Sequence, residues 1–530
     1  MKRATLIGAA LGALLAGVAG ASAKTLVYCS EGSPESFSPA LGTAGTTFDA
    51  TQPVYDQLVE FKRGTTETGP GLAESWDVSA DGKTIVFHLR KGVKFHAAGG
   101  FTPTRDFNAD DVIFSFDRQM NPKNPYHSVS NGKFSYFNDM DMPKLIASVA
   151  KVDDYTVKFT LNEPNAPIIA NLAMPFASIY SAEYADWLAK KGQQAQIDQT
   201  PVGTGPFYFV NYQKDAVIRY KKNELRNFGE KAMVDDLVFA ITPDAAARFS
   251  KMKAGECQVN GYPLPADLPA IKADPKFKVV SASGLNIAYW SFNVTKPPMD
   301  NLKVREALSM AIDRDAIIKE VYGGNAIPAP TLIPPTMWSY DASIKPVAYD
   351  PAKAKALLAE SGVKTPLAIE LWYMPVTRPY NPNGKRIGEM MQADLAKVGV
   401  TATLKTFEWG EYLKRAKAGE DQSSQLGWTG DNGDPDNFFF LLGCPGGKPA
   451  DNNISKWCDP TFNSLLEKAR TLPDQAARAK LYQQMQVIEA AQQPSFLIAH
   501  SVVSEVTAAN VTGYKMIPFG EHQFAGVDLK

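Results

Sequence analysis

Strand-like and helix-like patterns are interspersed along this 530-residue chain, and no segment of flexible-linker composition separates them. A chain of this length exceeds the size at which a single hydrophobic core stops growing, so two or more lobes are expected. Because no flexible linker joins them, the chain has to cross between lobes on short ordered segments. The sequence therefore predicts a mixed α/β protein of two or more lobes joined by short ordered segments.

The first residues have the pattern of a cleavable secretory signal. Lys2 and Arg3 precede an apolar run over residues 6–19, and residues 21–23 (ASA) supply a small-x-small cleavage pattern. A membrane-anchoring helix is the alternative, but the run is shorter than the ~20 residues of a bilayer span and contains glycines. Tyr28 precedes Cys29, so a lipid-attachment site is not indicated. We expect residues 1–23 to be removed and a soluble protein to remain in the periplasm.

Regular elements can be recognised at several places. Residues 84–89 alternate, with Ile85, Phe87 and Leu89 on one face, and residues 155–161 repeat the pattern. Both are typical of antiparallel strands with one buried face. Helices are predicted in four places: from a cap at Asp300 to Gly323, from a cap at Asp350 to Gly362, over residues 387–399, and over residues 475–492.

Four cysteines in an oxidising compartment favour two disulfides, and three pairings are possible. Cys444 and Cys458 flank a stretch rich in Gly, Pro and Asn, which favours a local loop closure stabilised by about 3 kcal/mol. That pairing would leave Cys29 with Cys257. A zinc site is the alternative, but the chain has no Cys-x-x-Cys pair and its five histidines are not spaced as ligands.

The charge balance and the motifs exclude several functions. The formal net charge is −1, and the chain has no basic stripe of the kind that binds nucleic acid. Gly-x-Ser-x-Gly, His-Glu-x-x-His and phosphate-loop patterns are absent. A secreted peptidase is therefore the weaker interpretation, and we expect no catalytic residue, no cofactor and no metal.

Several motifs follow one another over nearly the whole chain. They are GLAESW at 71–76, DGKT at 81–84, FHLRKGVKFH at 87–96, ADDVIFSF at 109–116, GTGPF at 203–207 and VREAL at 304–308. Together they resemble the family 5 extracellular solute-binding proteins. Within that family, residues 374–383 (MPVTRPYNPN) and 427–437 (GWTGDNGDPDN) resemble the members that bind dipeptides.

The resemblance implies a fold and a domain division. The fold is a two-lobed, hinged periplasmic binding protein of type II, similar to cluster C, with an extra subdomain in the first lobe. Lobe 1 would span residues 24–283 with the insertion at about 57–205, lobe 2 would span 284–501, and residues 502–530 would return to lobe 1. The resemblance also supports the disulfides Cys29–Cys257 and Cys444–Cys458.

The resemblance further implies a ligand and the residues that hold it. Arg378 would bind the carboxylate of a peptide and Asp431 its ammonium. The other candidate contacts are Tyr380, Trp428, Thr429, Gly430, Gly45, Thr46 and Thr47. The sequence departs from the dipeptide-binding pattern after Asn437, where Phe438, Phe439 and Phe440 replace smaller residues. Glutathione and haem, which close family members bind, are therefore alternative ligands.

The proposed roles agree with the chemistry of a dipeptide. An extended dipeptide is a zwitterion whose charges lie roughly 7 Å apart. A guanidinium grips a carboxylate with parallel hydrogen bonds, and a carboxylate accepts from an ammonium. Asp431, Asp434 and Asp436 are an alternative calcium cluster, but their spacing lacks that of a known calcium loop.

The expected partners follow from this role. They are a dipeptide or short peptide and an ABC permease in the inner membrane, with a chemoreceptor as a further candidate. The protein is expected to act as a monomer and to close around the peptide by hinge motion.

Overall fold

The computed structural model describes residues 23–530, so the predicted signal segment lies, apart from Ala23, outside the described residues. The lobe 1 part of the large sheet has the strand order β11-β1-β10-β9-β8. These strands are β1 (Thr25–Ser30), β8 (Phe207–Gln213), β9 (Val217–Lys222), β10 (Asp236–Ile241) and β11 (Val259–Gly261). Strand β1 runs parallel to both β10 and β11, whereas β9 is antiparallel to β10 and to β8.

The lobe 2 part of the sheet has the order β16-β15-β17-β13-β18. Its strands are β13 (Asn286–Phe292), β14 (Ala326–Pro328), β15 (Leu367–Trp372), β16 (Val400–Lys405) and β17 (Ser423–Thr429). Every residue of β13 is buried, because neighbouring strands and helices cover it on both faces.

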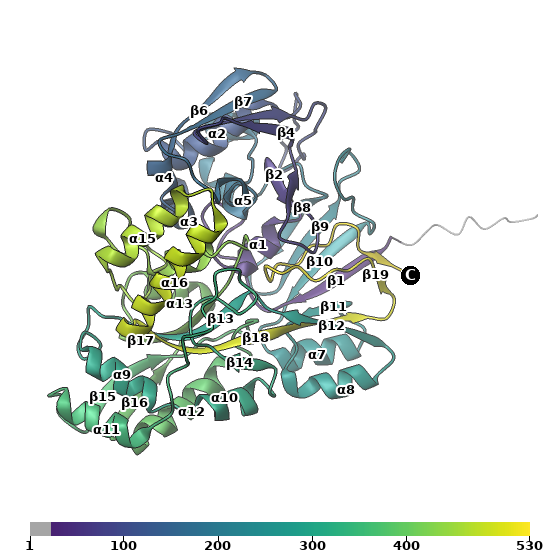
Figure 1. Cartoon of the computed structure of the whole chain (residues 1–530). Coiled ribbons are helices and arrows are strands. Elements are labelled where there is room, and N and C mark those ends of the chain that lie inside the picture. The colour runs from purple at the N-terminus through teal and green to yellow at the C-terminus, as the bar shows by residue number, and fades with distance from the viewer. Residues whose placement is uncertain (1–22) are drawn as a thin grey trace, which may run out of the picture.

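Strand β18 (Ser495–Ala508) joins the two parts. It pairs with β13 over Ser495–Ala499 and with β12 (Phe277–Ser283) over Val502–Ala508. Figure 1 shows this long strand running across the middle of the molecule. Its partners change at residues 501–502, and β12 ends at Ser283. The pairing therefore supports the proposed lobe boundaries near residues 283 and 501.

A separate small sheet lies at the top of Figure 1, in the region of the predicted insertion. Its order is β4-β5-β7-β6, with β4 (Ala73–Val78), β5 (Thr84–Leu89), β6 (Ile146–Asp153) and β7 (Thr156–Leu161). The predicted faces are confirmed, because Ile85, Phe87 and Leu89 are buried and β5 is antiparallel to β7. Burying each such side chain contributes about 1.5–3 kcal/mol. Two short hairpin strands and the C-terminal pair complete the strands: β2 (Val59–Phe61), β3 (Thr68–Pro70), β19 (Val511–Thr512) and β20 (Asp528–Leu529).

The helices cover these sheets, and none within residues 23–530 is both long and apolar enough to span a bilayer. Those that precede β13 are α1 (Gly45–Thr51), α2 (Ala109–Met120), α3 (Ser135–Asp139), α4 (Met142–Leu145), α5 (Ile168–Asn171), α6 (Ala182–Lys190), α7 (Ala245–Lys253) and α8 (Leu268–Ala273). Those that follow it are α9 (Leu302–Met310), α10 (Arg314–Val321), α11 (Pro351–Glu360), α12 (Gly384–Lys397), α13 (Trp409–Lys417), α14 (Asp436–Phe439), α15 (Pro460–Thr471) and α16 (Gln475–Gln492).

Buried side chains gather in two large hydrophobic cores. One contains residues of β1, β5, β7 and β10, and the other contains residues of β13, α9, α12 and β17. Trp428 packs against both. Two cores in one chain without a linker confirm the predicted two-lobed α/β architecture.

The helix predicted from Asp300 to Gly323 is wrong in two respects. Asn301, not Asp300, caps α9 by accepting from the Lys303 backbone N–H at 3.0 Å. The pattern then divides into two helices, because the Asp313 carboxylate accepts from the Ala316 N–H at 3.0 Å and starts α10. Such a side chain competes with the helical backbone for its own hydrogen bonds. The helices predicted near residues 350, 387 and 475 are confirmed as α11, α12 and α16.

These caps give a stability prediction. Replacing Asp313 by alanine removes the α10 cap and is expected to cost about 1 kcal/mol. Scanning calorimetry should show the lobe 2 transition roughly 2–4 °C lower. The matched control is Asp300→Ala, which removes an acid from the same region without removing a cap. An equal loss in both variants would contradict the assignment.

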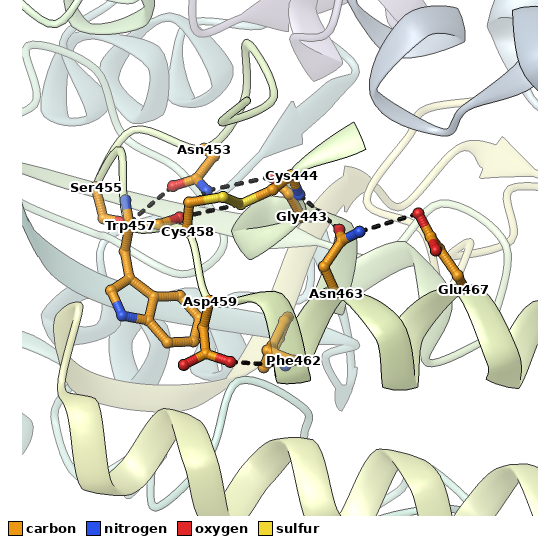
Figure 2. Close-up of a disulfide and its surroundings, with 10 residues drawn as sticks. All are labelled: Gly443, Cys444, Asn453, Ser455, Trp457, Cys458, Asp459, Phe462, Asn463 and Glu467. Atoms are coloured by element: carbon orange, nitrogen blue, oxygen red, sulfur yellow. Dashed lines mark hydrogen bonds between the residues drawn. A yellow bond between two sulfur atoms is a disulfide. The ribbon is translucent and has the colours of Figure 1, made fainter. Parts of the chain in front are cut away.

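Both predicted disulfides are confirmed. Cys29 in β1 is bonded to Cys257, and Cys444 is bonded to Cys458, with Cα–Cα separations of 5.8 and 5.7 Å. Figure 2 shows the second bond between a loop and the start of α15. The Asn453 amide bridges this loop by donating to the Trp457 carbonyl at 2.6 Å, and Asn463 accepts from the Cys444 N–H at 2.8 Å. The bond thus closes an already hydrogen-bonded loop.

Candidate functional site

A cavity of about 80 Å³ lies between the two lobes, and it brings together residues that are far apart in the sequence. Of the predicted contacts, it is lined by Gly45, Arg378, Tyr380, Trp428, Thr429 and Asp431. Thr46, Thr47 and Gly430 lie outside this lining. Thr47 instead accepts from the Glu35 N–H at 2.9 Å, and the Gly430 N–H donates to the Leu285 carbonyl at 2.7 Å.

Arg378 lies in a tight turn of lobe 2 and faces lobe 1. Its backbone exchanges hydrogen bonds with Asn381 at 2.9 and 3.0 Å, so the turn is fixed before any ligand binds. The guanidinium is 5% exposed and donates through Nη1 to Glu31 Oε1 at 2.5 Å. It also lies over the Trp409 ring, 5.1 Å from the centroid. Burial disfavours its charge, but Glu31 outweighs that effect and raises the pKa of Arg378.

Glu31 follows β1 and is itself held in place. It is 1% exposed, and the Tyr28 hydroxyl donates to its Oε2 at 3.2 Å. The Arg378–Glu31 pair therefore bridges the lobes at a buried position. Because a guanidinium has several N–H donors in a planar fork, its remaining N–H groups can bind a second carboxylate.

Asp431 follows β17 and is surrounded by a small hydrogen-bond network. The Tyr136 hydroxyl of lobe 1 donates to Asp431 Oδ2. Asn437 accepts from the Asp431 N–H at 2.7 Å and from Trp428 Nε1 at 3.1 Å, and it donates to Tyr136 at 2.6 Å. Burial raises the pKa of Asp431 to about 7, although the Tyr136 hydrogen bond acts in the opposite direction. This carboxylate has no cationic partner among the described residues.

Aromatic rings form much of the wall. Gly427 allows Tyr380 to lie close against β17, since a Cβ there would be 2.2 Å from the Tyr380 ring. Trp428 packs edge-on against Phe440 with centroids 5.2 Å apart, and Phe440 stacks on Tyr136 at 5.5 Å. Phe440, one of the three phenylalanines that depart from the dipeptide-binding pattern, thus packs against Tyr136, which donates to Asp431.

The neighbouring acids are paired with arginines. Asp434 accepts from Arg478 at 2.7 Å, and Asp436 accepts from Arg470 at 2.6 Å. The Asp434 side chain also accepts from the Asp436 N–H at 3.0 Å, which shapes the turn. Since both carboxylates are occupied in this way, the alternative of a calcium cluster with Asp431 is not supported.

Sequence reasoning missed Glu31, Tyr136, Trp409, Asn437 and Glu521. Asn437 is part of the motif that contains Asp431, so its position was a usable signal. Glu521 is 9% exposed and lines the cavity, and burial together with Asp431 raises its pKa well above the usual range. Glu31, Tyr136 and Glu521 belong to other segments that carry no local pattern.

Comparisons with known proteins agree with this geometry. Residues 67–449 match the family described as bacterial extracellular solute-binding proteins, family 5 Middle. A dipeptide-binding protein of Escherichia coli (strain K12) is 54% identical over 97% of this chain and 96% of its own length. Heme-binding protein A of Haemophilus influenzae is 48% identical over 96% of this chain and 93% of its own length.

A solved structure is similar over the same extent. The crystal structure of a dipeptide-binding protein from Pseudoalteromonas sp. SM9913, in complex with Met-Leu, superposes with a TM-score of 0.93 at 39% identity. The match covers 96% of this chain and 100% of that chain.

Proposed function

Because this chain belongs to the bacterial extracellular solute-binding proteins of family 5, we propose that it captures dipeptides or short peptides in the periplasm and delivers them to an ABC permease. One observation carries the proposal. Arg378 and Asp431 are buried, opposite in charge and on the wall of one cavity between the lobes.

The two charges match the two ends of a peptide. A carboxylate at Arg378 accepts from the guanidinium N–H groups that Glu31 leaves free. An ammonium at Asp431 supplies the cation that this buried carboxylate lacks. Because an unpaired buried charge costs several kcal/mol, a ligand with only one of the two charges leaves a penalty unrelieved. These two charged residues therefore select for length and for both free termini.

The closed form is stabilised by contacts between the lobes. Glu31 and Tyr136 of lobe 1 reach Arg378 and Asp431 of lobe 2, and Lys417 donates to Thr43 at 2.6 Å. A peptide that contacts the same residues favours the closed state, because it binds that state better than the open one. We propose that the monomer closes about the segments near residues 283 and 501 and that the closed form is what the permease recognises.

Capture rather than catalysis fits the lining of the cavity. The described lining residues include no Ser, Cys or His, so no Ser–His or Cys–His pair faces the cavity. Incubation with dipeptides should release no free amino acids. Turnover by the purified protein would establish the peptidase alternative.

The termini of the ligand give a direct test. Calorimetry should compare a zwitterionic dipeptide with its N-acetylated form and with its amide. Each blocked form is expected to bind at least tenfold more weakly, a loss of more than ~1.4 kcal/mol, because one buried charge stays unpaired. Equal binding of the three would show that Arg378 and Asp431 do not hold the termini.

Haem and glutathione are the competing ligands within the family. Of the residue types that hold haem iron in proteins, the described lining offers tyrosines (Tyr262, Tyr289 and Tyr380) and no His, Cys or Met. Titration with haem and with glutathione under the same conditions ranks them against the dipeptide. Tighter binding of either would replace the peptide proposal.

A further inference from the structure

A second cavity, of about 270 Å³, lies against the first one. Phe48, Asp431, Phe519 and Glu521 line both, so these four side chains form a shared wall. The rest of the second cavity belongs to lobe 1, between the segment that contains Gln52 and Glu60 and the C-terminal segment. We call it the acidic cavity. The binding of peptide termini proposed above does not use it.

The acidic cavity has polar groups that lack partners. Gln52 Oε1, Tyr55 Oη, Glu60 Oε1 and Arg63 Nε are buried and make no hydrogen bond within the described part of the chain. Leaving a buried donor or acceptor unsatisfied costs about 1–3 kcal/mol. Four such atoms around one space are therefore a site that a polar ligand group would stabilise.

The charges of this cavity favour a cation. Among its charged lining residues are the acids Asp56, Glu60, Glu230, Asp431 and Glu521 and the bases Lys62, Arg63 and Arg226. Arg226 neutralises Asp56 through bonds of 2.9 and 3.0 Å, and Lys62 pairs with Glu67 at 3.0 Å.

Four carboxyl groups that line this cavity make no ion pair within residues 23–530, those of Glu60, Glu230, Asp431 and Glu521. The one lining base without an ion pair there is Arg63, which Glu230 attracts. Burial, the charge of Asp56 and a hydrogen bond with Asp56 raise the pKa of Glu60 to about 8, because Arg226 and Arg90 do not supply enough counter-charge to offset these effects. A cationic group in the cavity would supply it.

The acidic cavity lies next to Asp431, and therefore next to the first residue of a peptide whose ammonium binds Asp431. The ammonium bound to Asp431 and the side chain of the first residue are attached to the same Cα atom. A side chain attached to this Cα can therefore extend along the shared wall toward the acidic cavity. The rings of Phe48 and Phe519 offer apolar surface there to an aliphatic stem. The polar end of a long side chain then reaches the region of Glu521 and Glu60.

We propose that the acidic cavity receives the side chain of the first residue of the bound peptide and favours a cationic one, lysine or arginine. This rests on the proposed function, since it assumes an ammonium on Asp431. It adds a specificity that the grip on the two termini does not provide. Glu521 and Glu60 are the residues that determine it.

The experiment compares peptides that differ in one charge. Norleucine carries an unbranched aliphatic side chain without the ammonium of lysine. Calorimetry should give Lys-Ala at least tenfold tighter binding than norleucine-Ala. Ala-Lys and Ala-norleucine carry the same two side chains on the second residue instead. They should bind alike, because the proposal places only the first residue's side chain in the acidic cavity. Ala-Ala serves as the reference for terminal binding.

The variants locate the preference. Glu521→Gln and Glu60→Gln should each reduce the Lys-Ala to norleucine-Ala ratio at least threefold. Glu256→Gln should preserve it, because Glu256 is an exposed acid of lobe 1 that does not line the cavity. An unfolding temperature close to that of the unmodified protein shows that each variant is folded, and either variant alone suffices if the other does not fold. Binding of Ala-Ala without a Lys-Ala preference in the unmodified protein overturns this inference alone. Absence of all dipeptide binding overturns the proposed function with it.

Discussion

Replacement of Arg378 by alanine is expected to weaken dipeptide binding by about a hundredfold or more, since truncating one partner of a buried charged pair costs about 2–5 kcal/mol. Two effects add. The peptide carboxylate loses its guanidinium, and Glu31, 1% exposed, is left as a buried charge without its cationic partner. Closure is weakened as well, because this pair bridges the lobes. Calorimetry with one zwitterionic dipeptide measures the loss.

Two further variants separate these effects. In Arg378→Ala with Glu31→Ala, the unpaired acid is gone, so part of the affinity lost in the single variant should return. Arg386→Ala is the matched control, because Arg386 lies in α12 of the same lobe, half exposed and paired with Glu320 at 2.8 Å. Its affinity should be unchanged. Unchanged binding in Arg378→Ala would reject the role assigned to this residue.

Replacement of Asp431 by asparagine is expected to weaken dipeptide binding by about a hundredfold and to remove its dependence on pH below neutrality. The pKa of Asp431 is about 7 because of burial. A bound ammonium favours the carboxylate and lowers that pKa, so binding releases a proton. Affinity should therefore fall as the pH decreases below about 7. At the alkaline end it should fall again, when the peptide ammonium, with a pKa of about 8, loses its proton.

Proton release can be measured directly. The apparent binding enthalpy of the unmodified protein should differ between two buffers with different ionisation enthalpies, and that of Asp431→Asn should differ less. Asp434→Asn is the control, because Asp434 is paired with Arg478 and does not line the cavity. It should retain both the affinity and the acid limb. A flat pH profile in the unmodified protein would show that Asp431 does not carry the ammonium.

Much of the fold follows from local patterns. The alternation over β5 places Ile85, Phe87 and Leu89 in the core, because successive side chains of a strand point to opposite faces. The interpretation of residues 300–323 as one helix failed where a local side-chain hydrogen bond at Asp313 competed with a continuing apolar stripe. Periodicity reports which face is buried, but it does not report where the backbone hydrogen bonds are interrupted.

The candidate site, like the fold, was predictable from the sequence only in part. The identities of Arg378 and Asp431, and their need for opposite charges, were accessible because the chemistry of a zwitterion and a family resemblance pointed to them. Thr46 and Thr47 were selected from a Gly/Thr-rich loop, but neither lies in the lining, to which the loop contributes Gly45 together with Thr43, Ala44 and Phe48. Composition does not specify which residues of a loop face a cavity.

By itself, the sequence determined the two-lobed α/β class, and the family resemblance that it carries indicated the disulfide pairing and the two charged residues proposed to hold a peptide. Only the tertiary structure decided that Glu31 pairs with Arg378, 347 residues away, and that Tyr136 donates to Asp431, 295 residues away. It also placed the acidic cavity beside Asp431. The physical reason is that local patterning encodes burial and hydrogen bonding within a few turns or strands. Contacts between lobes arise only when separate cores pack together, and no period in the chain records which side chains then meet.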